Sequence, residues 1–278
     1  MLTYFISDIH VDFYTPISNN YVTLIPYYEK FFNDFFLPAE AVSIAGDIAN
    51  DYYIQAAFLK FVSGKYRQVY YTPGNHDMIV HGASMGEGNP FPSSEERLKA
   101  VKNELSGYPN VHILEGDMAD GFAGCMGMCD FSVYPSYLQN ANNILGQWLM
   151  GCFDGRHWEM YGQMPLTIWK HYDKVMESLV KRQPKVMLTH FAPKQLGIQE
   201  EYVNDVGTTY FYFDGAKYLD QLASPSIWHC GHTHGTFNSE YTTPTGVTHR
   251  LICNPLGYED DSNAFAFNKA NGTFLIEV

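Results

Sequence analysis

Aspartate, asparagine and histidine side chains recur in five short motifs along this chain, and each motif follows an apolar run typical of a β-strand. The motifs offer two aspartates, one asparagine and four histidines as donors, with a fifth histidine beside them. Such a donor set suits two adjacent divalent metal ions, which predicts hydrolysis of phosphate esters. The motifs are Ser7-Asp8-Ile9-His10, Gly46-Asp47, Gly74-Asn75-His76-Asp77, Thr189-His190 and Gly231-His232-Thr233-His234.

The chemistry explains why these residue types are needed together. Water is a poor nucleophile at neutral pH, and the oxygens of a phosphate ester already carry negative charge. Two metals held about 3.5–4 Å apart lower the pKa of the water that they share and bind the phosphate oxygens. Extra carboxylates would neutralise the metals and weaken them as Lewis acids. The predicted reaction is therefore direct attack by a metal-bridging hydroxide.

The spacing within the motifs predicts which side chains act as metal ligands. Asp8 and His10 lie two residues apart in extended chain, so both can face one cleft. Asp47 is the natural bridging carboxylate, and Asn75 offers a neutral amide oxygen. The remaining predicted ligands are imidazoles, from His190, His232 and His234.

The histidine next to Asn75 is predicted to stay free of metal. His76 would then protonate the leaving alkoxide or donate a hydrogen bond to the phosphate, and Asp77 would orient its imidazole. Asn75 and His76 are therefore the expected substrate contacts, and His76 and Asp77 the expected catalytic residues.

Each motif alone also has an ordinary interpretation. Gly46-Asp47 is common in turns and helix caps, and a single histidine such as His190 is more often a structural residue. Five motifs in order, each after a strand, favour the metal site instead. His229 would point away from the neighbouring ligands and is predicted to lie in the core. Arg156-His157-Trp158 is predicted to form a surface loop. Residues 210–213 are predicted to pack in the core and at the rim, and stacking of Tyr210 or Tyr212 on a substrate ring is the alternative.

The elements that must position these motifs alternate between strands and helices, which predicts an α/β architecture with partly parallel sheets. Ligands of such sheets gather at the carboxyl ends of the strands. Residues 117–164 show no clear periodicity, and residues 82–92 are predicted to form a loop. Helices are expected at 27–36, at 51–63 with Asn50 as N-cap, from the capping-box pair Ser93 and Glu96 to Gly107, and at 165–182. Strands are expected at 2–7, 41–45, 68–72, 111–114, 185–188, 227–230, 251–253 and 273–278.

Composition limits the partners and the compartment. The net charge of -13 and only five arginines disfavour binding of long nucleic acid, which needs cations along the phosphates. No stretch has the form of a signal peptide or a membrane span. The five cysteines show no metal or disulfide pattern, so free thiols in the cytoplasm are expected. The chain lacks repeats and linkers, which predicts a single domain at 1–278 with a substrate-shaping insertion around 78–165.

In this order the motifs resemble the calcineurin-like metallophosphoesterase superfamily, whose pattern is D-x-H, G-D, G-N-H-D/E, a lone His and G-H-x-H. The resemblance spans residues 8–234. Residues 189–193, 228–234 and 253–258 are similar to a bacterial and phage branch. Leu256 stands where that branch usually has arginine, which is a departure at a position that could bind substrate.

The resemblance implies a four-layer αββα sandwich with two mixed sheets. It also implies that His76 is the general acid or a phosphate-binding residue. Manganese is the expected metal, with iron, zinc and nickel as alternatives. One metal would take Asp8, His10, Asp47 and His234, and the other would take Asp47, Asn75, His190 and His232.

The sequence therefore predicts a metal-dependent phosphoesterase that acts on a small phosphorylated substrate or a phosphoprotein. Two alternatives are a nuclease or cyclic-nucleotide phosphodiesterase with the same chemistry, and a non-catalytic interaction protein on the same fold. Members of the second kind usually lose ligands or the catalytic histidine, and here all are present. No feature of the sequence predicts an oligomeric state.

Overall fold

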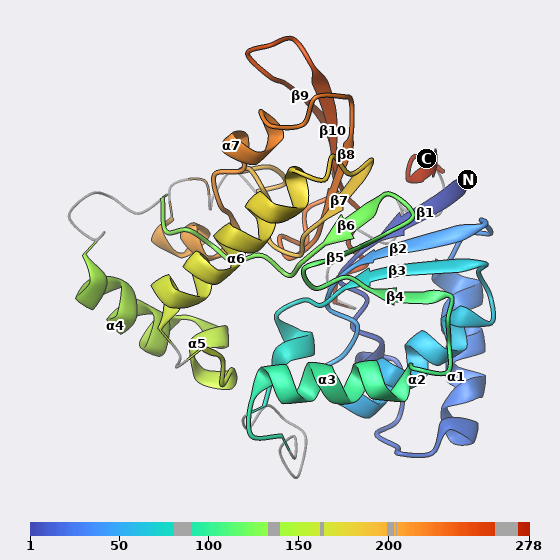
Figure 1. Ribbon diagram of the computed structural model, residues 1–278. Helices are drawn as coiled ribbons and strands as arrows, with labels where there is room; N and C mark the ends of the chain where they lie inside the picture. The colour runs from blue at the N-terminus through green and yellow to red at the C-terminus, as the bar shows by residue number, and fades with distance from the viewer. Residues whose placement is uncertain (81–90, 133–139, 162–163, 199–202, 204, 259–271) are drawn as a thin grey trace.

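Two β-sheets lie face to face between layers of helices in the computed structural model of the protein (Figure 1). The structure describes residues 1–80, 91–132, 140–161, 164–198, 203, 205–258 and 272–278. Most of the loop predicted at 82–92 lies outside these residues. The arrangement confirms the predicted four-layer αββα sandwich with two mixed sheets.

The first sheet has five strands in the order β11-β1-β2-β3-β4. Strands β1 to β4 run parallel, and β11 pairs antiparallel with β1. The three central strands carry no charged residue, as expected for strands that are covered on both faces. Their bounds are Leu2–Ile6 for β1, Ala41–Ala45 for β2, Gln68–Thr72 for β3, Val111–Ile113 for β4 and Leu275–Glu277 for β11.

The second sheet has six strands in the order β5-β6-β7-β8-β10-β9. Strands β6, β7, β8 and β10 are parallel, and the two edge strands, β5 and β9, are antiparallel to their neighbours. Their bounds are Asp117–Ala119 for β5, Phe122–Gly124 for β6, Val186–Leu188 for β7, Ile227–Cys230 for β8, Phe237–Thr242 for β9 and Thr248–Cys253 for β10.

Helices cover the outer faces of both sheets (Figure 1). Helices α1 to α3 lie on the side of the first sheet, and α6 and α7 lie on the side of the second. The buried residues of α6 include Tyr172, Met176 and Leu179, which lie on one face of the helix. The helices are α1 (Tyr21–Phe35), α2 (Tyr52–Ser63), α3 (Ser94–Glu104), α4 (Ala141–Gly151), α5 (Phe153–His157), α6 (Pro165–Val180) and α7 (Ala216–Leu219).

Capping residues set where two of these helices begin. The Ser93 hydroxyl accepts the backbone N–H of Glu96 at 3.2 Å, as the capping-box spacing predicts. Helix α2 begins one residue later than predicted, because the Asp51 carboxylate accepts the N–H groups of Tyr53 and Ile54. The prediction of Asn50 as this N-cap is therefore wrong, and its side chain is available for another contact.

Aromatic and polar contacts join the two sheets. The rings of Tyr70 and Phe122 stack at 3.9 Å between centroids. His229 lies in the core, as predicted, where its Nδ1 is 2.9 Å from the Ser43 hydroxyl and its ring meets the edge of Phe5. Burial lowers the pKa of His229 to about 3, so the imidazole is neutral.

Residues 117–164 hold β5, β6, α4 and α5, none of which the sequence pattern predicted. The prediction of a surface loop at 156–158 is also wrong, because Arg156 and His157 end α5 and Trp158 is 2% exposed. The Trp158 ring packs edge-on against Trp148 of α4 at 5.7 Å. Such non-periodic aromatic residues are placed by tertiary contacts rather than by a local pattern.

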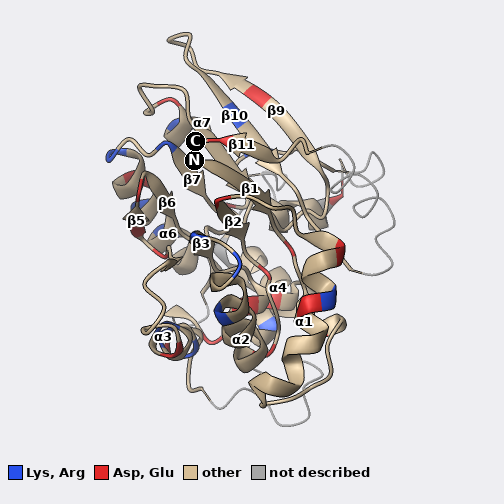
Figure 2. Ribbon diagram, turned by 90° about the vertical axis from the view of Figure 1, so that its right-hand side faces the viewer, with Lys and Arg blue, Asp and Glu red and all other residues tan. Residues whose placement is uncertain are grey.

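Acidic and basic residues are interspersed on the outer helices. Figure 2 shows both signs next to each other on α1 and α3.

All five cysteines are buried free thiols, as expected. Among the described residues, no helix combines the length and the apolar character that a membrane span requires.

Candidate metal centre

The predicted ligands lie together at one end of the sandwich, because the strands that precede them are parallel within each sheet. The ligands follow β1, β2 and β3 in the first sheet and β7 and β8 in the second. Beyond β10 the chain pairs with the end of β1, where Ser7 and Pro255 form a bridge. The carboxyl ends of both sheets therefore face the same region.

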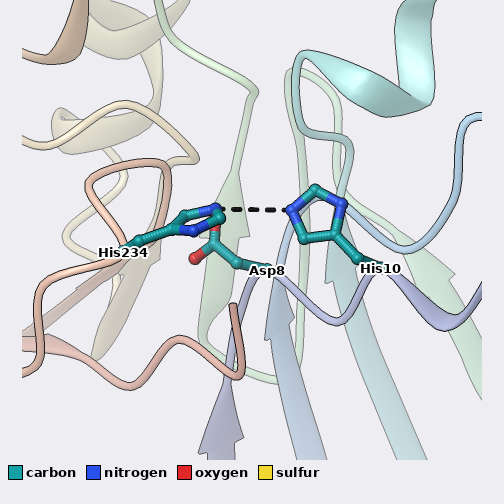
Figure 3. Close-up of side chains that lie close together, drawn as sticks. All are labelled: Asp8, His10 and His234. Carbon is teal, nitrogen blue, oxygen red and sulfur yellow. Dashed lines mark hydrogen bonds and ion pairs between the residues drawn. The ribbon is translucent and has the colours of Figure 1, made fainter. Parts of the chain in front are cut away.

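One group of donors consists of Asp8, His10 and His234, whose ligand atoms all lie within 4.8 Å of one another. Figure 3 shows the two imidazoles facing each other, with Nε2 atoms 3.4 Å apart and the Asp8 carboxylate beside them. Oδ1 of Asp8 is 3.6 Å from Nε2 of His234.

A second group consists of Asp47, His190 and His232, and Asn75 completes it. Nε2 of His190 lies 3.2 Å from Oδ2 of Asp47 and 2.8 Å from Oδ1 of Asn75. Nδ1 of His232 is 3.0 Å from the same amide oxygen. Four donors thus converge around one point.

Asp47 lies between the two groups. Its Oδ2 is 3.2 Å from Nε2 of His190 in one group and 3.8 Å from Nε2 of His10 in the other. Its Oδ1 accepts the backbone N–H of His76 at 2.8 Å. This is the position that a carboxylate shared by two metals would occupy.

Unsatisfied polar atoms at the centre fit a pair of cations. Among the described residues, Oδ2 of Asp8 and Nδ1 of His10 are buried without a hydrogen-bond partner. A buried carboxylate oxygen without a partner is costly unless a cation neutralises it. Carboxylate, amide and imidazole donors are ligands that manganese, iron, zinc and nickel accept, so the residues fit two divalent metals.

Electrostatics at Asp47 also favour a cation. Burial alone would raise the pKa of Asp47, but the neighbouring imidazoles of His190 and His76 hold it well below its ordinary value. Burial would likewise lower the pKa of His190, yet Asp47 and Asp8 raise it to about 10. Without metal, a proton on His190 thus offsets the negative charge of Asp47. A metal must displace this proton, so its affinity should increase with pH.

The backbone at the centre is strained. Among the described non-glycine residues nine have positive φ, and five of these are predicted ligands with φ between 44° and 68°. This left-handed conformation is unfavourable for residues with a Cβ and is concentrated at functional sites. The five ligands are Asp8, His10, Asp47, His232 and His234.

Gly74, in the third motif, has no room for a side chain. A Cβ on Gly74 would lie 2.8 Å from Cγ of Asp47, which is closer than real Cβ contacts. The backbone of the loop after β3 thus passes directly against the shared carboxylate. A side chain at this position would displace Asp47.

The His76 imidazole belongs to neither group. Its Nδ1 is 2.6 Å from Oδ1 of Asn50, and its Nε2 is 3.3 Å from the Tyr258 hydroxyl. Because an amide oxygen can only accept, Nδ1 carries the proton in the neutral ring. Burial lowers the pKa of His76, although Asp47 opposes the shift. His76 is thus placed beside the donors without being one of them.

The prediction that Asp77 orients His76 is wrong. The Asp77 carboxylate is fully buried and accepts the backbone N–H groups of Ile48, Ala49 and Gly74 at 2.9–3.2 Å. It therefore joins the loops after β2 and β3, and Asn50 makes the contact with the imidazole instead. Burial raises the pKa of Asp77 to about 6. Adjacent residues in a tight turn project in different directions, which sequence adjacency does not show.

Sequence reasoning missed several residues that support the centre. Arg97 of α3 is fully buried and donates to the backbone carbonyls of Ala49, His76 and Ile79. Asp154 accepts a hydrogen bond from the Asn75 amide. No periodic or motif signal marks either residue. Asn50 could have been noticed, since it lies three residues beyond Asp47.

Aromatic rings border the donors. Tyr258 stacks on His10 at 4.4 Å, Phe153 stacks on His76 at 5.0 Å, and Phe211 lies 4.9 Å from His232. Of the two tyrosines considered for substrate stacking, Tyr212 is 3% exposed and belongs to the core. The other, Tyr210, places its backbone carbonyl 3.2 Å from Nε2 of His232.

Comparison with known proteins agrees with this geometry. The family model for calcineurin-like phosphoesterases matches residues 1–236. An uncharacterized protein of Acanthamoeba polyphaga mimivirus is 25% identical over 279 residues, which cover 94% of this chain and 92% of that protein. A phosphopantetheinyl hydrolase from Mycobacterium tuberculosis has a similar structure, with a TM-score of 0.67, 15% identity, and coverage of 100% of this chain and 95% of its own. The last likeness concerns the fold alone.

Proposed function

The chain belongs to the calcineurin-like phosphoesterase family, and we propose that it is a metal-dependent phosphoesterase that hydrolyses mono- or diesters. Its substrate would be a small phosphorylated molecule or a phosphorylated protein side chain. The observation that carries the proposal is the pair of donor groups on either side of Asp47. Two cations that share one carboxylate form an arrangement that is suited to phosphate-ester hydrolysis.

The ligands would divide between two metals, with the carboxylate of Asp47 available to both. When bound, the metals would supply an activated water and hold the phosphate oxygens. Manganese is the metal that we propose; a mixed set of oxygen and imidazole donors without a thiolate accepts it, as it also accepts iron, zinc and nickel. One metal would be held by Asp8, His10, Asp47 and His234, and the other by Asp47, Asn75, His190 and His232.

His76 would act on the substrate from beside the metals. Asn50 holds Nδ1, so Nε2 is the atom that meets the phosphate or the leaving oxygen. Tyr258 contacts Nε2 and stacks on His10, which places an aromatic ring next to the same position. The rings of Phe153 and Phe211 lie next to His76 and His232, and they favour a substrate with a flat organic group.

Metal-dependent hydrolysis tests the proposed function. Metal-depleted protein would be titrated with manganese and assayed on aryl phosphate mono- and diesters, a cyclic nucleotide, a single-stranded oligonucleotide and a phosphopantetheinyl ester. We expect turnover of small esters that rises to saturation at two metals per chain. Turnover of the oligonucleotide or cyclic nucleotide alone would favour the nuclease or phosphodiesterase alternative. A protein that binds two metals and hydrolyses nothing would favour an interaction protein.

A single-turnover experiment in water labelled with heavy oxygen tests the one-step mechanism. Direct attack by water places one label in the phosphate released from a monoester. A phosphoenzyme formed by attack of a side chain would also release singly labelled phosphate when water hydrolyses it, so the label must be combined with a search for the covalent intermediate. Trapping of a phosphorylated protein by acid quench would therefore contradict the direct attack.

A further inference from the structure

The side chain of Asn75 is held on the side opposite the metal donors by a residue from a distant part of the chain. Its Nδ2 donates to Oδ1 of Asp154 at 2.8 Å, across 79 residues of sequence. Asp154 belongs to the short helix α5, and it is 2% exposed. The Asn75 amide thus lies between a carboxylate on one side and the imidazoles of His190 and His232 on the other.

This contact decides which end of the amide faces the metals. In this contact the Asp154 oxygen is the acceptor and the amide group is the donor, so the nitrogen end of the amide faces Asp154. The amide oxygen is then turned toward His190 and His232, where it can bind a cation. In the flipped orientation two oxygens would face each other, and the nitrogen, which is not a metal ligand, would take the oxygen's place.

The same segment also holds the backbone of Asn75. The indole N–H of Trp158 donates to the Asn75 carbonyl at 2.9 Å. Trp158 packs against Trp148 of α4, and a Cβ on Gly155 would lie 2.8 Å from the Trp148 carbonyl carbon. Close packing against α4 therefore restricts the movement of α5, the helix that carries Asp154.

We infer that Asp154 is a positioning residue for the metal held by Asn75, His190 and His232, with Trp158 as its partner on the backbone. This inference rests on the proposed metal centre. According to this inference, the segment that contains α4 and α5 supports one metal site, in addition to the predicted role of the insertion around 78–165 in shaping the substrate site. Partners that orient a ligand typically contribute about 10- to 100-fold to metal affinity.

Two substitutions of similar size separate orientation from charge. Asp154→Asn removes the charge but retains a carbonyl oxygen that can accept from the Asn75 amide. Asp154→Leu removes the acceptor as well. Metal binding would be measured by calorimetry with manganese, and the two sites would be distinguished by electron paramagnetic resonance, in which a manganese pair differs from an isolated ion. Thermal unfolding of the metal-free proteins would check that both variants are folded.

We expect Asp154→Leu to bind one manganese normally and the second about 10- to 100-fold more weakly, with the spectrum of an isolated ion at intermediate metal concentrations. Asp154→Asn should keep the spectrum of the pair. Equal affinity for both metals in wild type and Asp154→Leu would overturn the inference. Weakening of both metals alike in a folded Asp154→Leu protein would also overturn it. Failure of the wild-type protein itself to bind two metals would instead reject the proposed centre.

Discussion

Replacement of Asn50 by aspartate would test whether His76 acts as a general acid. In the native protein a neutral amide oxygen lies 2.6 Å from Nδ1 of His76, and Asn50 itself is 6% exposed. Burial lowers the pKa of His76, which disfavours the protonated imidazole that a general acid requires. Asn50→Asp changes the acceptor from neutral to negative without changing its size.

The size of the expected pKa shift of His76 follows from its short distance to residue 50. A carboxylate within hydrogen-bond range of an imidazole typically raises its pKa by about 1–3, equivalent to about 1.4–4 kcal/mol in favour of the charged form. A general acid is active only when protonated, so kcat falls as pH rises through its pKa. Raising the pKa of His76 should therefore move the alkaline limb of the kcat profile to higher pH by the same interval.

Two measurements on wild type and Asn50→Asp check this prediction. Nuclear magnetic resonance of the histidine ring protons in the zinc-loaded protein gives the pKa of His76 directly, and the kcat profile shows its effect on turnover. Asn50→Leu serves as a matched control, because it removes the acceptor and should lower the pKa. If the resonance moves and the kcat profile does not, His76 is not the general acid. If the resonance does not move, the contact between Asn50 and His76 is refuted.

Three further perturbations probe the site and its support. Asp47→Asn is expected to abolish metal binding and turnover together. His76→Ala should keep both metals and lower kcat by about 10²–10⁴-fold. Metal analysis distinguishes the two variants, and a His76→Ala protein that binds no metal would show that His76 is a ligand. Gly74→Ala places a Cβ 2.8 Å from Cγ of Asp47 and should prevent metal binding in calorimetry, while Gly107→Ala, whose Cβ meets nothing within 4 Å, should bind normally. His229 has a pKa of about 3 in the folded protein, below the ordinary 6.5, so its contribution to stability is present above pH 6.5 and is lost as pH falls. That loss is about 2 kcal/mol between pH 7 and pH 5. Urea unfolding of the metal-free protein should show a smaller pH difference for His229→Asn, and an equal difference would mean that His229 does not titrate in this range.

Most strands and helix α6 were predictable because their signals are local, whereas α1 begins six residues before the expected start at 27. Strands β2 and β3 match their predicted bounds, since each is a short apolar run that ends at a glycine or proline turn. Edge strand β9 was missed because its residues alternate between partly buried and exposed positions without an apolar face. Helix α4 was missed although Ile144 and Trp148 lie four residues apart and are both buried, and its contact with Trp158 is a tertiary one.

The same distinction applies to the metal site, where the donors lie in short local motifs and their hydrogen-bond partners lie far away in the sequence. The metal-donor motifs are recognisable because each lies within a few residues and follows a strand. The partners that hold them come from elsewhere in the chain. Asn75 depends on Asp154, and the loop after β3 depends on Arg97, which donates to carbonyls in two separate loops. These contacts are formed by chain segments that meet only after the sheets have assembled.

The sequence alone determined the donor types, their order and their place at strand ends, because these properties are encoded within short stretches of chain. Tertiary structure alone decided which donors face one another and which neighbours orient them. Asp77 lies next to His76 in sequence but binds backbone N–H groups beneath the loop, while Asn50, from the preceding loop, reaches the imidazole. The direction of a side chain depends on backbone torsion and on packing against distant residues, and neither is specified by adjacency along the chain.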